Sequence, residues 1–326
     1  MNIPNDYKTA FEAGATATIL IVLMLIVAVE VSAQSNPIPS RLEPLMRSEL
    51  PDGAACLLDI IEGTIIASWG EAIWLGEGRP AGSVLKLFTS YALIAAGESA
   101  TTVFYCPPSS VDVPATDSCW YKPGHGNMTL KTALAFSCNA YFRQWVAAAD
   151  DAPAEKFFRK LRLLESKLPD SAVERAKWLT GLSHQIRPKP VMLISALAAL
   201  FNGGVIYSIE SLEEGSRCAP VTSLLIDAHA LGVISAGLRE CAASGTAAAA
   251  QAAVGIEPLM AKTGTSVHID GGEADSLRTD GFCFLLYPAE RPRYLLAVFS
   301  PDGRGGGRAA EAAGVIMARL IEELAR

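Results

Sequence analysis

The 326-residue chain has little basic charge. Lysine and arginine together number 27 against 34 aspartates and glutamates, which gives a formal net charge of −7 at pH 7 and a pI near 5.3. Nucleic acids and anionic membrane surfaces attract basic proteins, so neither is expected as the main partner. Internal repeats and long low-complexity tracts are also absent from the sequence. Half of the residues are hydrophobic, and the chain is long enough to bury the core of one large domain or two modest ones.

The chain also lacks the short cysteine and histidine spacings of zinc sites. Its four histidines are scattered and no Cys-x-x-Cys pair occurs, so the sequence predicts neither a metal nor another cofactor. Seven cysteines are an odd number, and at least one therefore stays free or pairs outside the chain. Cys106 and Cys119 bracket a loop rich in Pro, Ser and Asp. A disulfide between them and two unpaired thiols are both consistent with the sequence.

An uncharged apolar run, "ATATILIVLMLIVAV", covers residues 15–29. It is shorter than the roughly 20 residues that cross a bilayer comfortably, and "VSA" at residues 31–33 suits a signal-peptide cleavage site. A cleaved signal peptide and an uncleaved anchor fit equally, and a buried helix is a third interpretation. The first two export the rest of the chain, so we expect an extracytoplasmic location, in the periplasm or on the outer face of the cytoplasmic membrane. The expected layout is a leader over 1–33, a linker over 34–52 and one domain over 53–326.

Strand patterns lie at both ends of this domain, with helical patterns between them. "AACLLDIIEGTIIASWG" predicts two strands, and "PLMAKTGTSVHI", "TDGFCFLLYP" and "RYLLAVFSPDG" predict three more before a final helix from Ala309. We therefore expect an α+β fold with an antiparallel sheet of about five strands built from both ends of the domain, flanked by helices, and an inserted all-helical subdomain. The junction of sheet and helices is where a catalytic pocket is expected.

Three short motifs occur in order along the chain. Ser83-Val-Leu-Lys86 is its single Ser-x-x-Lys, Ser137-Cys138-Asn139 its single Ser-x-Asn, and Lys262-Thr263-Gly264-Thr265 its single Lys-Thr-Gly. Each motif alone is common by chance. The ordered trio is specific, and it is the set found in class A β-lactamases and penicillin-binding proteins.

The first motif predicts a serine nucleophile with a lysine base. Positions i and i+3 share a helix face, so Ser83 and Lys86 can point into one pocket. A serine hydroxyl needs a base to take its proton, but a free lysine is neutral in only about 0.04% of molecules at pH 7. Burial and a second cation, Lys262, both lower a lysine pKa, so the sequence predicts these two perturbations at Lys86. The alternative is that Lys86 is an ordinary solvated surface lysine.

The other two motifs supply partners for this pair. Ser137 can relay a proton to or from an amine, and the Asn139 amide can hold a peptide bond because it both donates and accepts. Lys262, Thr263 and Thr265 suit a substrate carboxylate, and Gly264 lets the substrate pack close to the strand. The backbone N–H groups of Ser83 and Thr265 are expected to form the oxyanion hole. The alternative for Ser137 and Asn139 is an ordinary helix boundary, where such residues are common caps. The alternative for the Lys-Thr-Gly-Thr segment is an edge strand unconnected with a site.

Over roughly residues 53–326 the chain resembles the transpeptidase domain of penicillin-binding proteins. Besides the trio, "CWYKPGHGNMTLKTALAFSCNAYF" is similar to a run in class B, elongation-type members, and "SGTAAAA" resembles the Gly-Thr-Ala before their Lys-Thr-Gly strand. The resemblance implies a peptidoglycan D,D-transpeptidase: a stem peptide acylates Ser83, D-alanine leaves, and the amine of a neighbouring stem forms the cross-link. It also implies acylation by β-lactam antibiotics and association with cell-wall synthesis proteins.

The chain departs from this family at several points. Only about 50 residues precede the domain, "RPAGS" stands in place of Pro-Gly-Ser, and Lys189 stands where the family tends to have threonine. Three alternative functions stay open: a D,D-carboxypeptidase, a serine β-lactamase, and a non-catalytic scaffold of the same fold that binds peptidoglycan or a protein partner. Class A β-lactamases position their deacylating water with a glutamate and an asparagine four residues on. No asparagine occurs between Asn139 and Asn202, which counts against that class.

Overall fold

The computed structural model describes residues 42–109, 118–270, 273–301 and 306–326, with backbone alone for 268–270 and 273–277. The apolar run at 15–29, the leader expected over 1–33 and the first half of the expected linker lie outside these residues. Within the ranges that the structure describes, no helix is long and apolar enough to cross a membrane.

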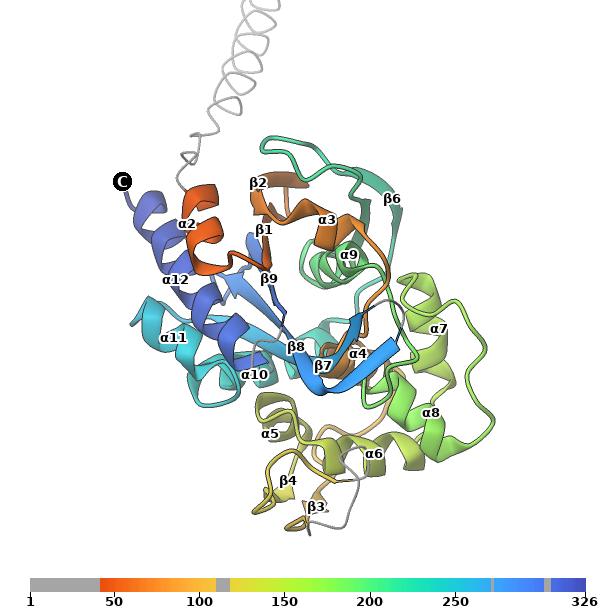
Figure 1. The fold of residues 1–326 in the computed structure, drawn as a ribbon. Helices are drawn as coiled ribbons and strands as arrows, with labels where there is room; N and C mark the ends of the chain where they lie inside the picture. Colours follow the sequence, from red (N-terminus) through yellow and green to blue (C-terminus); the bar gives the residue numbers. More distant parts are fainter. Residues whose placement is uncertain (1–41, 110–117, 271–272, 302–305) are drawn as a thin grey trace, which may run out of the picture. The chain divides into compact units, whose positions relative to one another are not determined.

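Five antiparallel strands form the central sheet, in the order β2-β1-β9-β8-β7 (Figure 1). Two strands come from the start of the domain, β1 (Ala54–Asp59) and β2 (Thr64–Trp69), and three from its end, β7 (Met260–Asp270), β8 (Glu273–Tyr287) and β9 (Tyr294–Ser300). β1 pairs with β9 along its whole length, which joins the two ends of the sequence. The sheet predicted from the sequence is confirmed.

Helices cover both faces of this sheet. Side chains alternate between the two faces of a strand, yet every residue of β1 and of β9 is buried. Helix α12 (Gly306–Leu324) packs on β8 and β9 from one side and also contacts α2 (Leu42–Glu49). Helices α4 (Leu85–Ala95) and α9 (Pro190–Phe201) lie on the other side (Figure 1). The central strands are therefore core throughout, and β2 and β7 form the two edges.

The segment between β2 and β7 is mainly helical, as predicted. Its helices besides α4 and α9 are α3 (Glu71–Leu75), the 3-10 helix η1 (Gly82–Val84), α5 (Leu130–Ala135), α6 (Asn139–Ala148), α7 (Ala152–Lys160), α8 (Ala172–Leu179), α10 (Ala228–Ala243) and α11 (Ala248–Val254). Two short hairpins interrupt them, β3 (Phe104–Cys106) with β4 (Gly126–Met128), and β5 (Val205–Ser208) with β6 (Ala219–Ser223).

The structure differs from the sequence prediction over the second half of the expected linker. Residues Leu42–Glu49 form helix α2 instead of an extended connection. Leu42 and Met46 are four residues apart, on one face of this helix, and both are fully buried. The helix packs against β2 and α12, so burial of two large side chains outweighs the Pro- and Ser-rich composition of the segment.

Candidate active site

Ser83 lies on a tight turn at the start of a buried helix. η1 runs directly into α4, so the helix predicted from Ser83 begins as a 3-10 turn. Ser83 is half-buried, whereas every residue over 84–94 is buried. Ser83 is thus the residue at this end of the helix whose side chain is partly accessible to solvent.

Two glycines let the turn lie directly against β7. Gly82 has a φ of 54°, and a β-carbon there would lie 2.1 Å from the carbonyl oxygen of Thr265. A β-carbon on Gly264 would lie 2.6 Å from Cγ2 of Val84. Both positions need glycine, because any other side chain would push the two segments apart. The nucleophile is therefore held beside the edge strand of the sheet.

Lys86 is fully buried one turn beyond Ser83. Its Nζ lies 2.9 Å from Ser83 Oγ, 3.0 Å from the carbonyl oxygen of Ser137 and 2.6 Å from Asn139 Oδ1. Carbonyl and amide oxygens only accept hydrogen bonds. A neutral lysine amine has two N–H groups, which these two oxygens use, so its lone pair faces the Ser83 hydroxyl. The geometry is that of a base next to its nucleophile.

Burial and charge make the neutral amine accessible near pH 7. Burial, followed by the positive charge of Lys262, lowers the pKa of Lys86 to about 7. Burial also lowers the pKa of Lys262 itself. Both perturbations predicted from the sequence are present, and a solvated Lys86 is ruled out because its side chain is 0% exposed.

Ser137 contacts both buried lysines from a strained backbone. Its φ is 52°, in the left-handed region that costs a residue with a β-carbon roughly 1–2 kcal/mol. Its hydroxyl oxygen lies 3.3 Å from Lys262 Nζ and 3.5 Å from Lys86 Nζ. Such strain is commonly stored at functional sites. The turn between α5 and α6 therefore carries a hydroxyl to a point between two amines that are far apart in the sequence.

The Lys-Thr-Gly-Thr segment lies on β7, and its residues alternate between two environments. Lys262 points toward Ser137, whereas the Thr263 hydroxyl lies 2.5 Å from that of Thr246. The exposed Thr265 accepts a hydrogen bond at 2.9 Å from the backbone N–H at the start of α12. Thus five of the predicted residues, Ser83, Lys86, Ser137, Asn139 and Lys262, come together, and Gly264 contacts the nucleophile's turn. Thr263 instead supports β7 through Thr246, a partner that the sequence did not indicate.

A known family has this chain's motifs and fold. The family model of the penicillin binding protein transpeptidase domain matches residues 73–322. The chain belongs to this family. The resemblance inferred from the motifs is thereby confirmed. No curated protein matches the chain in sequence.

Solved structures with the same fold are distant in sequence. The D,D-transpeptidase domain of a peptidoglycan glycosyltransferase from Eggerthella lenta has a TM-score of 0.66 at 20% identity, over 87% of this chain and 82% of that one. Penicillin-binding protein 2 of Pseudomonas aeruginosa has 0.68 at 16% identity, over 87% and 76%. Penicillin-binding protein A of Mycobacterium tuberculosis has 0.67 at 17% identity, over 90% and 82%. At these identities the likeness establishes the fold of the transpeptidase domain.

Four side chains that no sequence motif brings together as a group meet next to the Ser137–Asn139 turn. The sulfur atoms of Cys106, Cys119 and Cys138 and a ring nitrogen of His125 all lie within 4.8 Å of one another. All three cysteines are free thiols here, so the disulfide that the sequence allowed between Cys106 and Cys119 is not formed. No two of the four residues lie within five positions of each other, which is why no zinc spacing was visible. The fold therefore brings together four possible metal ligands that the sequence spacing did not reveal.

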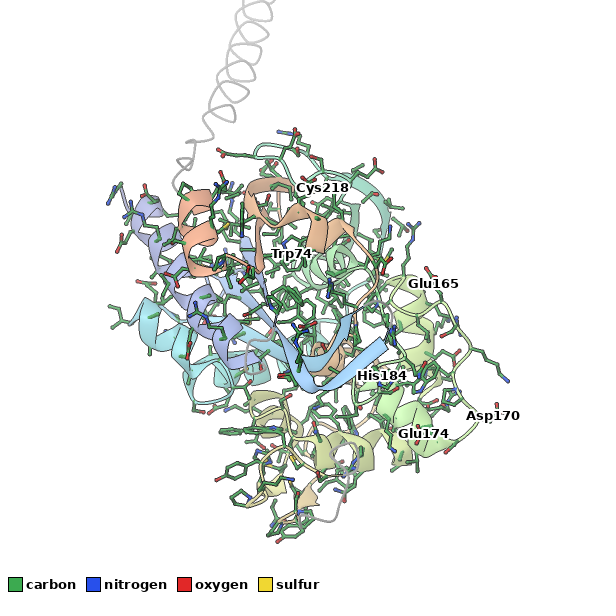
Figure 2. All side chains as sticks on the ribbon, in the orientation of Figure 1. Trp74, Glu165, Asp170, Glu174, His184 and Cys218 are labelled. Carbon is green, nitrogen blue, oxygen red and sulfur yellow. The ribbon has the colours of Figure 1, made fainter. Side chains whose placement is uncertain are left out.

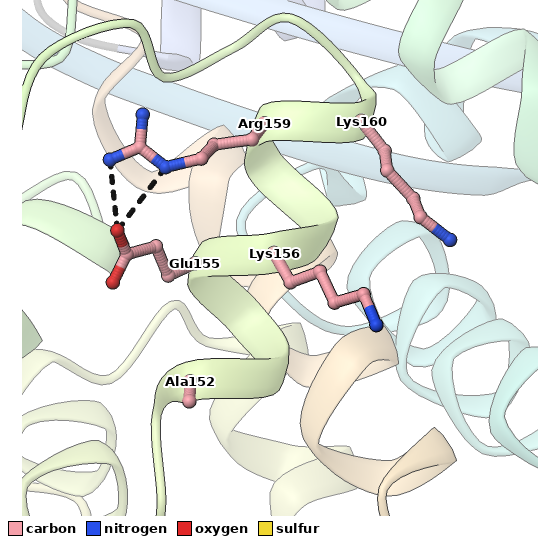
Figure 3. A pocket seen from close by; sticks show the side chains of 5 residues that line it. All are labelled: Ala152, Glu155, Lys156, Arg159 and Lys160. Carbon is pink, nitrogen blue, oxygen red and sulfur yellow. Dashed lines mark hydrogen bonds and ion pairs between the residues drawn. The ribbon is translucent and has the colours of Figure 1, made fainter.

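A separate open hollow on α7 lies away from the motif residues of the transpeptidase domain. Its lining residues are Ala152, Glu155, Lys156, Arg159 and Lys160 (Figure 3). Glu155 pairs there with Arg159 at 2.8 Å, and the two lysines extend outward. This hollow offers no nucleophile next to a base, so it is not the active site.

Proposed function

We propose that this protein is a peptidoglycan D,D-transpeptidase that works through an acyl-enzyme on Ser83. The observation that carries the proposal is the position of the buried Lys86 amine, 2.9 Å from Ser83 Oγ, with a pKa lowered to about 7. A hydroxyl beside such an amine is an activated nucleophile. The family of the domain is consistent with acyl transfer.

In the acylation step the Ser83 oxygen attacks the carbonyl carbon of the penultimate D-alanine of a stem peptide. The Ser83 proton moves to Lys86 Nζ as the new C–O bond forms. The negative charge on the carbonyl oxygen is stabilised by the N–H groups of Ser83 and Thr265, which belong to two segments in direct backbone contact. The C–N bond then breaks. Ser137, next to Lys86, passes the proton to the nitrogen of the departing D-alanine.

In the second step an amine of a neighbouring stem attacks the Ser83 ester. The new C–N bond forms, the C–O bond breaks, and the proton of the amine returns through Ser137 and Lys86 to Ser83 Oγ. β7 is an edge strand, and the edge of a sheet suits an extended peptide because it offers main-chain hydrogen bonds. Lys262 provides the positive charge for the terminal carboxylate of the donor peptide.

The same chemistry predicts β-lactams as inhibitors that acylate Ser83. Penicillin-binding protein A of M. tuberculosis, which shares the fold, forms an acyl-enzyme with penicillin G. Penicillin-binding protein 2 of Helicobacter pylori, another protein of this fold, forms a complex with MreC. By analogy we propose that this chain works with cell-wall synthesis proteins on the extracytoplasmic side of the membrane, where peptidoglycan is assembled.

The first test measures whether penicillin acylates Ser83 and how long the acyl-enzyme lasts. The purified full-length chain is incubated with a fluorescent penicillin, and its intact mass is recorded against time, with Ser83→Ala as the control. A long-lived adduct on the unmodified chain alone supports the proposal, whereas no adduct favours the scaffold. An adduct that decays within seconds while the drug is consumed identifies a β-lactamase.

A second assay separates the transpeptidase from the carboxypeptidase. A stem pentapeptide is supplied with and without a second stem that carries a free amine. Cross-linked dimer as the main product supports the proposal. D-alanine release that is the same with and without the acceptor amine identifies a carboxypeptidase and overturns it.

A further inference from the structure

The segment that leads to the nucleophile's turn has no regular structure of its own. Between α3 and η1, residues 76–81 form neither helix nor strand, and two of them, Gly76 and Gly78, are glycines. Glycine restricts the backbone less than any other residue, so fixing such a segment in one position costs much conformational entropy. Its position must therefore come from contacts with the rest of the fold.

Arg79 makes such contacts through both its side chain and its backbone. Nη1 of its guanidinium lies 3.7 Å from Oδ2 of Asp280 on β8, and the guanidinium carbon lies 5.3 Å from the ring centroid of Phe299 on β9. Its backbone N–H donates at 3.1 Å to the carbonyl oxygen of Pro188, in the connection between α8 and α9 that also carries His184 (Figure 2). One residue thus ties the segment to two strands of the sheet and to a loop.

The carboxylate that Arg79 contacts lies on the strand next to β7. Asp280 is the register partner of Ser266, which directly follows Thr265 on β7. The backbone N–H groups of Thr265 and Ser83 are the expected oxyanion donors, and Ser83 comes four residues after Arg79. The ion pair therefore links the segment before one donor to the strand beside the other.

We propose that the ion pair between Arg79 and Asp280 holds the Gly82–Ser83 turn against β7 and so positions Ser83 for acylation. Both are positioning residues, which act through the turn. The effect on acylation rests on the proposed function, whereas the effect on the order of the turn does not.

Burial gives this ion pair the strength to hold a backbone segment. The side chain of Asp280 is 2% exposed and that of Arg79 is 29% exposed. Charges attract one another more strongly in the protein interior than in water, and removal of one partner is costly because it takes a counter-charge from a buried ion. A planar guanidinium can stack on the Phe299 ring and meet a carboxylate at the same time. The two contacts together fix the arginine in one orientation.

Close packing passes any movement of this segment on to the nucleophile. A β-carbon on Gly264 would lie 2.8 Å from the carbonyl oxygen of Ala81, and one on Gly181 would lie 1.8 Å from that of Gly82. The turn is thus packed between β7 and the connection from α8 to α9. A displacement of Ser83 by about 1 Å is enough to lower the rate of its reaction about 100-fold.

A second ion pair on the same sheet has the same chemistry and serves as the matched control. Nε of Arg293 lies 2.8 Å from Oδ2 of Asp59, whose side chain is 6% exposed, and the guanidinium carbon lies 5.7 Å from the ring centroid of Tyr294. Asp59 pairs in register with Tyr294, the first residue of β9, whereas Phe299 lies near the other end of that strand. The control pair therefore lies at the end of β9 away from the nucleophile's turn.

Acylation by penicillin tests the positioning role. Arg79→Met keeps an apolar side chain against Phe299 and removes the charge. Its acylation rate constant at saturating penicillin should fall at least about tenfold, while the dissociation constant of the non-covalent complex changes by less than about threefold. Asp280→Asn should behave in the same way, and the double variant should fall no further than the slower single variant, because the two residues act together.

Two further variants separate position from stability. Arg79→Lys retains the charge and should keep more of the acylation rate than Arg79→Met. Arg293→Met removes the charge of the control pair and should leave the acylation rate within about twofold of the unmodified chain. Circular dichroism and urea unfolding show that each variant is folded. Asp280→Asn carries the same test if Arg79→Met does not fold.

Hydrogen–deuterium exchange measures the order of the turn without any chemistry at Ser83. The amides over residues 82–85 should exchange at least about tenfold faster in Arg79→Met than in the unmodified chain, and at the unmodified rate in Arg293→Met. Faster exchange without slower acylation would overturn the positioning role. Equal acylation and equal exchange in the two variants, or additive losses in the double variant, would overturn the proposal. If the unmodified chain is not acylated at all, the proposed function fails, and exchange over 82–85 then decides whether the pair holds the turn.

Discussion

The Lys262 amine and the Ser137 hydroxyl lie 3.3 Å apart, although 125 residues separate them in the sequence. The strand that carries Lys262 and the turn that carries Ser137 thus meet at one hydroxyl group. Lys86 approaches the same hydroxyl from α4, at 3.5 Å. Three elements of the domain therefore meet at Ser137. Its hydroxyl group and its left-handed backbone can be tested separately.

Replacing Ser137 by alanine and by glycine separates the hydroxyl from the backbone. Both changes remove the proton relay, and acylation by penicillin should fall by about 10²–10⁴-fold in each. Glycine adopts a φ of 52° without strain, so the glycine variant should be more stable than the alanine variant by about 1 kcal/mol. Acylation rates and urea unfolding midpoints measure the two effects. Equal stabilities would show that the left-handed backbone carries no strain.

The pH dependence of acylation should report the titration of Lys86. Its pKa is lowered to about 7, and the neutral amine, present above that pH, is the active form. The acylation rate should therefore rise about tenfold per pH unit below 7 and level off above about 8.

A change at Lys262 tests the cause of this pKa. The charge of Lys262 lowers the pKa of Lys86, so Lys262→Met should move the midpoint of the profile to higher pH. Lys86→Met should abolish the profile together with the activity. A rate that does not vary between pH 6 and 8 would argue against Lys86 as the base.

Much of the catalytic centre was predictable because its parts are local. Ser83 and Lys86 are one turn apart on one helix, and the short motifs around Ser137 and Lys262 name their residues directly. The sheet was predictable too, because β7, β8 and β9 follow one another and show continuous strand patterns. The contact between Lys86 and Ser137 could also be predicted, on the assumption that the three motifs meet in one site.

Contacts that depend on the tertiary fold were not predictable. Cys106, Cys119, His125 and Cys138 converge because a hairpin folds back beside the start of α6, and their spacing carries no periodic signal. Helix α2 likewise forms where its two buried apolar residues pack and the helix contacts β2 and α12, although the local composition resembles a linker. In each case a long-range contact overrides what the local sequence indicates.

Thr246 and Thr263 should be energetically coupled. Their hydroxyl groups lie 2.5 Å apart, and Thr263 is 4% exposed. Removing one hydroxyl leaves the other without this partner, so Thr246→Val and Thr263→Val should each lower the free energy of unfolding by about 1–2 kcal/mol. The double variant should cost roughly 1 kcal/mol less than the sum of the single ones. Urea denaturation of the four proteins measures this, and strictly additive losses would mean that the bond contributes nothing.

Gly82 and Gly97 form a matched pair for testing the close approach of the nucleophile's turn to β7. Both have positive φ, 54° and 102°, so alanine is strained at either position. At Gly97 nothing lies within 4 Å of an added β-carbon, whereas at Gly82 the β-carbon would lie 2.1 Å from the carbonyl oxygen of Thr265. Gly97→Ala should therefore cost about 1 kcal/mol of stability and leave acylation unchanged.

Gly82→Ala should cost at least about 2 kcal/mol more, since the turn must move away from the strand. Displacing Ser83 by even about 1 Å from the backbone N–H of Thr265 should lower the acylation rate by about 100-fold. Urea unfolding and penicillin acylation of the two variants, side by side, measure both effects. Similar stability and acylation in both variants would mean that the contact between Gly82 and Thr265 does not position the nucleophile, and that Lys86 alone sets its reactivity.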